Sequence, residues 1–303
     1  MTGPVVVLGA GGFLGRHVVA ELRGAGLAVR VPGLHAAGRL DLTGLDRAAW
    51  DDLLRGSSGV INAAGRTTGS EAELEAANVQ LLSAALAAAG RAGAALVTFS
   101  SAAEYGRTED GHAAHETDEA RPLAPYGHSK LRGTQALQRA VQQGQVRAAA
   151  LRLTNPLGEG AGESTLPGRA ARELRQATRL GLESVRFGPL GARRDFVDAR
   201  DAARVALHLL GQLRAEEPQN PQTLPDVINV GSGEARPVRD LVTGLAAQLG
   251  YHGELLEDAP GSPRSGDVPY QRADLTRLHA SGFRARYSFG ESLRALLHGA
   301  APD

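Results

Sequence analysis

The apolar residues of the chain fall into short uninterrupted runs that alternate with stretches of helical periodicity. The first run, 5–8, is apolar throughout, which is typical of a strand buried on both faces. A glycine-rich turn follows it, and then Leu14, Val18 and Leu22 recur every four residues as one apolar helix face. The same reading predicts strands at 27–31, 60–61, 96–99 and 148–153, and helices near 45–55, 71–90 and 127–143. Strands that alternate with helices indicate βαβ units and hence a parallel α/β sheet.

The pattern loosens after Thr154, where glycine and proline become frequent. Helices are predicted near 166–180, 200–213 and 237–249, and a strand at 227–230. We therefore expect a main α/β domain and a smaller C-terminal α/β lobe that covers a substrate. The expected main domain comprises 1–155 with returning segments near 191–230, and the expected substrate-binding lobe comprises 156–190 and 231–303.

Composition excludes several classes of protein. The 303 residues carry 33 basic and 33 acidic side chains, so nucleic acid is not an expected partner. The absence of cysteine excludes disulfides, thiolate catalysis and cysteine-bound zinc. His112 and His115 lack an evident third ligand, so no metal site is expected. The start of the chain lacks a charged leader and no apolar run has the length of a membrane span, so we expect a cytoplasmic location without membrane contact.

A glycine motif occupies the turn between the first strand and the first helix. Gly9, Gly12 and Gly15 follow the spacing Gly-x-x-Gly-x-x-Gly. Glycines let the backbone turn tightly and approach a pyrophosphate, while the helix N-terminus offers free N–H groups to the anion. In this context the turn, with Phe13 and Leu14, is predicted to bind a dinucleotide, which makes the sheet a Rossmann-type doubly wound one. A tight turn without a ligand is the alternative.

The chain holds 32 arginines but a single lysine, Lys130, four residues after Tyr126 on a predicted helix. Residues at that spacing share a helix face, so the ammonium can favour the ionised phenol, whose ordinary pKa is about 10. Lysine is also a slim point charge, suited to ribose hydroxyls that the broad arginine fork fits poorly. The pair predicts an acid–base group; an ordinary surface pair is the alternative.

Two serines, Ser100 and Ser101, follow the predicted strand 96–99 at the edge of the sheet where ligands collect. A hydroxyl there can hydrogen-bond a reacting carbonyl oxygen. A serine that caps its own turn is the alternative.

Together these motifs resemble the extended short-chain dehydrogenase/reductase family, in its epimerase/dehydratase branch. The resemblance extends over nearly the whole chain, through the ordered segments 62–65, 152–158, 194–197, 229–233 and 264–267. It implies that Ser101, Tyr126 and Lys130 are catalytic. Besides the glycine motif, it implies cofactor contacts from Asp41, Leu42, Ala63, Ala64, Asn78, Ser100, Tyr126, Lys130 and Asn155. It implies substrate contacts from Ser101, Ala102, Tyr126, Asn155, Arg194 and Arg264.

One departure from the family pattern concerns the reaction. Dehydratases of this branch carry an acidic pair directly after the catalytic hydroxyl, and this chain has Ala102 and Ala103 there. Neither side chain can move a proton, so dehydration is not expected.

A second departure concerns the cofactor. In NAD enzymes of this kind a carboxylate after the second strand holds the adenosine ribose, but no acidic residue stands between Glu21 and Asp41 here. The segment carries Arg30, His35 and Arg39 instead. NADP is therefore favoured over NAD, with Arg30 and Arg39 as cofactor-binding residues.

The expected activity is hydride transfer at a carbinol or keto carbon of a nucleotide-activated sugar, as epimerisation or 4-keto reduction. Two alternatives stay open: an NADPH-dependent ketoreductase of a non-sugar natural product, and a non-catalytic dinucleotide-sensing protein. The resemblance also implies a homodimer built from the helices near 74–90 and 127–143. Alanines in the first of these helices would permit close packing between subunits or, alternatively, within one chain: Ala84, Ala85, Ala87, Ala88 and Ala89.

Overall fold

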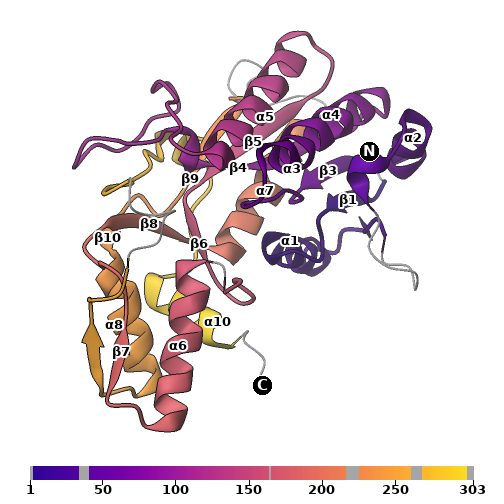
Figure 1. Cartoon of the computed structure of the whole chain (residues 1–303). Helices are drawn as coiled ribbons and strands as arrows, with labels where there is room; N and C mark the ends of the chain where they lie inside the picture. Colours follow the sequence, from indigo (N-terminus) through magenta and orange to yellow (C-terminus); the bar gives the residue numbers. More distant parts are fainter. Residues whose placement is uncertain (1–2, 34–40, 164, 216–224, 261–267, 299–303) are drawn as a thin grey trace.

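A six-stranded parallel sheet forms the centre of the computed structural model, which describes residues 3–33, 41–163, 165–215, 225–260 and 268–298 (Figure 1). The strand order is β2-β1-β3-β4-β5-β9. The strands are β1 (Val5–Leu8), β2 (Val29–Arg30), β3 (Gly59–Asn62), β4 (Ala95–Ser101), β5 (Ala148–Leu153) and β9 (Val227–Val230). The chain runs from β1 outward to β2 and then returns to the other side of β1, so the order reverses beside β1. In open α/β sheets, ligands bind at the carboxyl ends of the strands at such a reversal.

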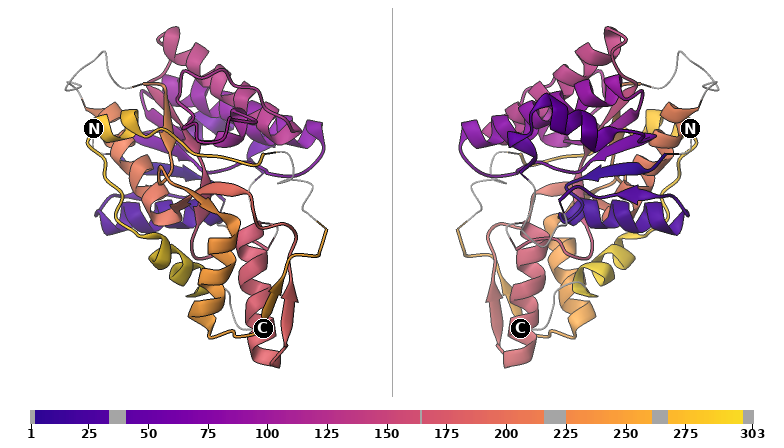
Figure 2. Two further views of the ribbon diagram at one scale, coloured as in Figure 1. Left: turned by 90° about the vertical axis from the view of Figure 1, so that its left-hand side faces the viewer. Right: turned by 90° about the vertical axis from the view of Figure 1, so that its right-hand side faces the viewer.

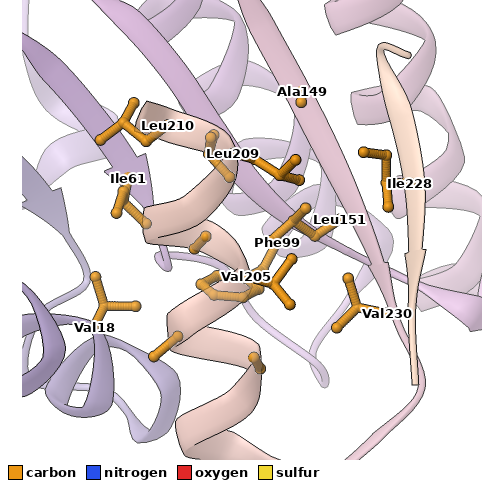
Figure 3. Packing of buried hydrophobic residues seen from close by; sticks show 14 of the residues in the cluster. Val18, Ile61, Phe99, Ala149, Leu151, Val205, Leu209, Leu210, Ile228 and Val230 are labelled. Atoms are coloured by element: carbon orange, nitrogen blue, oxygen red, sulfur yellow. The ribbon is translucent and has the colours of Figure 1, made fainter. Parts of the chain in front are cut away.

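Side chains of successive strand residues enter opposite cores, as the twofold alternation of a strand requires. On one face Val5 and Val7 pack beneath α1 (Phe13–Gly24) and α7 (Ala199–Arg214). Figure 3 shows Leu209 and Leu210 of α7 packed among residues of several strands on this face. The other face is covered by α2 (Arg47–Leu54), α4 (Leu81–Arg91) and α5 (Pro125–Gln142). Helices on both faces of a parallel sheet confirm the predicted doubly wound fold.

The C-terminal half adds a smaller α/β part beside the carboxyl edge of the sheet. Figure 2 shows this smaller part extending away from the main domain. Its core lies between three helices: α6 (Leu166–Leu180), α8 (Val238–Leu249) and α10 (Phe289–His298). One small sheet joins β10 (Ala235–Pro237), β8 (Arg193–Asp198) and β6 (Asn155–Leu157), and another joins β11 (Glu254–Leu256) and β7 (Ser184–Arg186).

Some elements differ from the prediction. Of the strand expected at 27–31, only Val29–Arg30 forms a strand, β2, which pairs with β1 at the edge of the sheet. The helix expected over 71–90 is divided into α3 (Glu71–Glu75), a π-helical turn (Ala76–Gln80) and α4. Ala273, Leu278 and Phe283, which the predicted boundaries assign to the lobe, pack in the core of the main sheet beside α9 (Thr276–Ala280). None of the helices in the described part of the chain has both the length and the apolarity to cross a membrane.

Candidate active site

The glycine turn after β1 forms a cradle that no side chain could share. Gly9 has a φ of +73°, and a Cβ there would lie 2.6 Å from the backbone nitrogen of Ala64. A Cβ on Gly15 would lie 2.1 Å from the carbonyl oxygen of Gly9, so α1 approaches the turn at backbone distance. Gly12 caps α1 without a side-chain hydrogen bond, and the first turn of the helix carries no acidic residue. An open, positively polarised helix end above a glycine cradle fits the pyrophosphate of a dinucleotide.

The loop after β3 lies against this cradle. The amide of Asn78, in the π-helical turn, bonds both backbone groups of Arg66, at 3.0 and 2.9 Å, and donates to the Ser129 hydroxyl at 3.0 Å. Gly65 lies close to the active-site helix, because a Cβ on it would approach within 2.6 Å of the Asn78 amide oxygen and 3.4 Å of the Lys130 Nζ. Asn78 thus joins the loop after β3, at Arg66, to α5, at Ser129.

Ser101, Tyr126 and Lys130 come together at the carboxyl end of β4. Ser101 ends the strand, and its hydroxyl accepts a hydrogen bond from the Ala103 N–H at 3.1 Å and bonds the phenol of Tyr126. Tyr126 and Lys130 stand one turn apart on α5, and the Lys130 Nζ lies 6.0 Å from the centre of the tyrosine ring. The Lys130 ammonium donates to the carbonyl of Phe99 at 3.0 Å, which holds it against the strand.

The protonation of the pair differs from the prediction. Burial raises the pKa of the Tyr126 phenol, the hydrogen bond with Ser101 lowers it, and the charge of Glu104 raises it; the net direction is upward. The net direction for the protein groups is therefore opposite to the one that the Tyr126–Lys130 spacing predicts, because burial outweighs the hydrogen bond with Ser101. Burial also lowers the pKa of Lys130 to about 8, although the charge of Glu104 opposes that change. At neutral pH the phenol carries its proton and can act as a donor.

Comparison with known proteins agrees with this geometry. Residues 5–231 match the family described as NAD dependent epimerase/dehydratase. The chain belongs to that family. A relative from Kitasatospora kifunensis, dTDP-6-deoxy-L-talose 4-dehydrogenase (NAD(P)(+)), is 34% identical, and the match covers 96% of this chain and 94% of the relative. The predicted membership of the extended short-chain dehydrogenase/reductases is confirmed, and the protein is an NAD(P)-dependent enzyme of that class.

Two solved structures extend the comparison. The structure of RMD from Pseudomonas aeruginosa complexed with NADPH is 26% identical with a TM-score of 0.81, over 98% of this chain and 99% of that one. MoeE5, solved with UDP-glucose and NAD, is 30% identical with a TM-score of 0.79, over 98% of each chain. The cofactor prediction of NADP or NAD is thus confirmed at the level of the dinucleotide.

On the adenosine side of the glycine cradle, the position of Arg30 differs from the prediction for this family member. Arg30 donates to the carbonyls of Leu53 and Arg55 at 2.8 and 2.9 Å, so its guanidinium is directed to the end of α2. The assignment of Arg30 to the adenosine phosphate is therefore withdrawn. Asp41 is exposed and caps the 3-10 helix Leu42–Gly44, where its carboxylate accepts hydrogen bonds from the N–H and the hydroxyl of Thr43. Arg39 and His35 lie outside the described residues.

On the substrate side, Asn155 is held from two directions. Its amide nitrogen donates to the carbonyl of Asp195 at 2.9 Å and to the side-chain oxygen of Gln271 at 2.6 Å. Gln271 could not be predicted as a partner of Asn155, because 116 residues separate the two and only the fold brings them together. Arg194 is buried in β8, and burial lowers the pKa of its guanidinium. Ala102 packs with Tyr105 and Ala114, and Arg264 lies outside the described residues.

A second departure concerns Ser100, which was predicted to contact the cofactor. Its hydroxyl instead bonds Glu104 and, at 2.9 Å, the hydroxyl of Thr134. Successive strand residues point to opposite faces, so Ser100 faces the interior when Ser101 faces the phenol. Glu104 and Thr134 were missed as members of the site. The available signal was a charged residue within a stretch of small and apolar residues at the end of a strand.

Proposed function

We propose that the protein transfers a hydride between NAD(P) and a carbinol or keto carbon of a nucleotide-activated sugar. The observation that carries the proposal is the grouping of Ser101, Tyr126 and Lys130 at the strand edge that the glycine cradle shares. The relatives support the substrate class. One is a dTDP-6-deoxy-L-talose 4-dehydrogenase. Another, from Pseudomonas aeruginosa, is an ADP-L-glycero-D-manno-heptose-6-epimerase that is 31% identical over 61% of this chain and 59% of the relative. A 6-deoxy sugar with reaction at C4 is the substrate we favour.

The cofactor would lie along the glycine cradle, with its nicotinamide toward Tyr126 and Asn155. When bound, it supplies or accepts the hydride. Tyr126 gives its proton to the substrate oxygen during reduction and takes it back during oxidation. Ser101 holds the same oxygen by a hydrogen bond while negative charge develops on it, and the Lys130 ammonium stabilises that charge.

The side chains after Ser101 distinguish this reaction from dehydration. Ala102 and Ala103 stand where an acid and a base would be needed, and both are unable to exchange protons. The three protein groups present suffice for reversible ketone–alcohol chemistry at one carbon. They also disfavour a dinucleotide-sensing role, because such a role needs no half-buried phenol and ammonium beside the cofactor cradle.

The test is a substrate panel with the full chain. A dTDP-4-keto-6-deoxyhexose is incubated with NADPH or NADH, and the loss of reduced-nicotinamide absorbance is followed. Consumption of the reduced cofactor with formation of a dTDP-6-deoxyhexose supports the proposal. Turnover of a non-sugar ketone alone would replace it with the ketoreductase alternative, and cofactor binding without turnover of any member would favour the sensor.

NADP(H) is expected to bind more tightly than NAD(H), by roughly tenfold, because one charge-assisted hydrogen bond contributes about 1.5–3 kcal/mol. The argument rests on Arg39 and on the lack of a carboxylate from 22 to 40. Fluorescence titration of both reduced cofactors measures the ratio, with Arg39→Ala as the variant and Arg30→Ala as its matched control. A ratio that Arg39→Ala leaves unchanged would contradict this assignment.

The protein is also expected to be a homodimer through α4 and α5, in the cytoplasm. Ala85, Ala88 and Ala89 are buried within the chain's own core, so three of the alanines considered for a dimer already serve the fold. Ala87 is exposed on α4 and stays available for contact. Light scattering at micromolar concentration should give twice the 31.5 kDa of one chain, and a monomeric mass would refute the dimer.

A further inference from the structure

Glu104 carries a completely buried carboxylate directly behind the active site. One of its oxygens accepts hydrogen bonds from the hydroxyls of Ser100 and, at 2.8 Å, Thr134. Its other oxygen accepts from the Nε of Arg152 at 2.8 Å, in an ion pair with almost no exposure to solvent. All the described hydrogen-bond donors around the carboxylate are therefore side chains of β4, β5 and α5.

The partners of Glu104 are the neighbours of the reactive groups. Ser100 precedes Ser101 in β4, and Thr134 lies one helical turn beyond Lys130 on α5. Residues four apart on a helix share a face, so Tyr126, Lys130 and Thr134 form one row directed at the strand. A single carboxylate thus connects the strand that carries Ser101 with the helix that carries the phenol and the ammonium.

Stability alone gives little reason for this arrangement. Removing a carboxylate and a guanidinium from water is costly, and apolar side chains of similar volume often stabilise a fold as well as such a pair does. The pair does, however, place one fixed negative charge close to two groups whose protonation the reaction requires.

We propose that Glu104 is a positioning residue of the active site, whose carboxylate ties β4 to α5 and supplies the negative field in which Tyr126 and Lys130 work. This inference rests on the proposed function, since it concerns the same acid–base pair. It adds a residue behind the site that sets how the reactive side chains are held and charged.

The other charges around Glu104 define what its removal would do. Its charge raises the pKa of Tyr126 and opposes the fall in the pKa of Lys130. Arg152 neutralises one side of the carboxylate, stacks 4.8 Å from the centre of the Tyr105 ring and donates to the carbonyl of Glu116 at 3.3 Å. Without the Glu104 charge, the positive charge of Arg152 also loses its ion-pair partner. The missing negative charge and the uncompensated positive charge both favour the ionised phenol of Tyr126 and the neutral amine of Lys130.

The test is Glu104→Gln, which keeps the size and an acceptor oxygen but removes the charge. The titration of Tyr126 is read from tyrosinate absorbance as the difference between each protein and its own Tyr126→Phe partner. We expect the midpoint to fall by about one pH unit in Glu104→Gln, because an adjacent charge moves a pKa by about 1–3 units. An unchanged midpoint in the folded variant would overturn the proposal. Because no substrate is present, this result is independent of whether the protein acts on nucleotide sugars.

Two further variants separate the electrostatic effect of Glu104 from its role in linking β4 to α5. Glu116→Gln is the matched control, since it also removes a buried carboxylate near Arg152, and we expect it to leave the Tyr126 midpoint in place. Thr134→Val breaks the link to α5 without changing charge, and it should lower kcat several-fold at a constant midpoint. If Glu104→Gln does not fold, the double variant Glu104→Gln/Arg152→Met removes both charges, and its midpoint should also fall. An equal shift in Glu116→Gln would contradict the assignment to Glu104.

Discussion

Replacement of Tyr126 by phenylalanine is expected to lower kcat by about 10²- to 10⁴-fold, the usual contribution of a general acid or base. The substitution removes only the hydroxyl, which bonds Ser101 and is the group that we assign to transfer a proton to the substrate oxygen. The ring would keep its place on α5, so the binding of NADPH should change little. Steady-state kinetics and a fluorescence titration on the same preparation measure the two quantities.

The matched control is Tyr287→Phe, which alters a tyrosine stacked on Arg200 away from the active site. It should retain activity within a factor of two or so, as most surface substitutions have effects within about 0.5 kcal/mol. Residual turnover above a tenth of the original in Tyr126→Phe would mean that another group donates the proton.

Lys130→Arg is expected to fold and yet lose activity by at least about 100-fold. The ammonium fits between the carbonyl of Phe99 and the backbone of Gly65, where a Cβ would stand only 3.4 Å from the Nζ. A guanidinium is broader and needs a planar space, so it must displace this loop or withdraw from the phenol. A displacement of about 1 Å in a positioned group is enough to cost 10²-fold in rate.

The control for this substitution is Arg132→Lys on the same helix, where an exposed arginine pairs with Glu75 at 2.7 Å. It exchanges the same two residue types and should leave kcat unchanged. Full activity of Lys130→Arg would contradict a role for Lys130 in catalysis, and the presence of a single lysine in the chain would then have no functional explanation.

The substitution Lys130→Met is expected to change the free energy of unfolding. Folding lowers the pKa of the Lys130 amine from 10.5 to about 8. Below pH 8 the amine is charged in both states, and its burial as an ammonium lowers the free energy of unfolding. Between pH 8 and 10.5 the folded state loses this proton while the unfolded state keeps it, so the free energy of unfolding rises. The variant should therefore be more stable than the original at neutral pH, by about 1–2 kcal/mol after loss of the Phe99 hydrogen bond. Urea unfolding should show this difference shrinking between pH 8 and 10.5.

The main sheet and the catalytic pair could be predicted because their signals are local. Val5–Leu8 and Ala148–Leu153 are observed at the predicted boundaries, since each is a continuous apolar run between turn residues. The pairing of Tyr126 with Lys130 follows from helical spacing alone. In these cases a few adjacent residues contain the whole argument.

What could not be predicted depends on contacts between distant segments. Arg30 bonds carbonyls more than 20 residues away, and periodicity cannot show where a long side chain on an edge strand ends. Ser100 and Ser101 read alike in sequence, and only the strand's orientation directs one toward Glu104 and the other toward the phenol. The direction of the Tyr126 pKa also depended on burial and on Glu104, which spacing does not reveal.

The central claim is hydride transfer at one carbon of a nucleotide-activated sugar. It is tested most directly with NADPH deuterated at the transferring position of the nicotinamide and a dTDP-4-keto-6-deoxyhexose, with mass spectrometry and NMR of the product. The account predicts one deuterium at C4 of the sugar for each cofactor oxidised, formed about 10²- to 10⁴-fold more slowly with Tyr126→Phe. Product formed without deuterium at C4, or a folded protein that binds NADPH and reduces no nucleotide sugar, would contradict it.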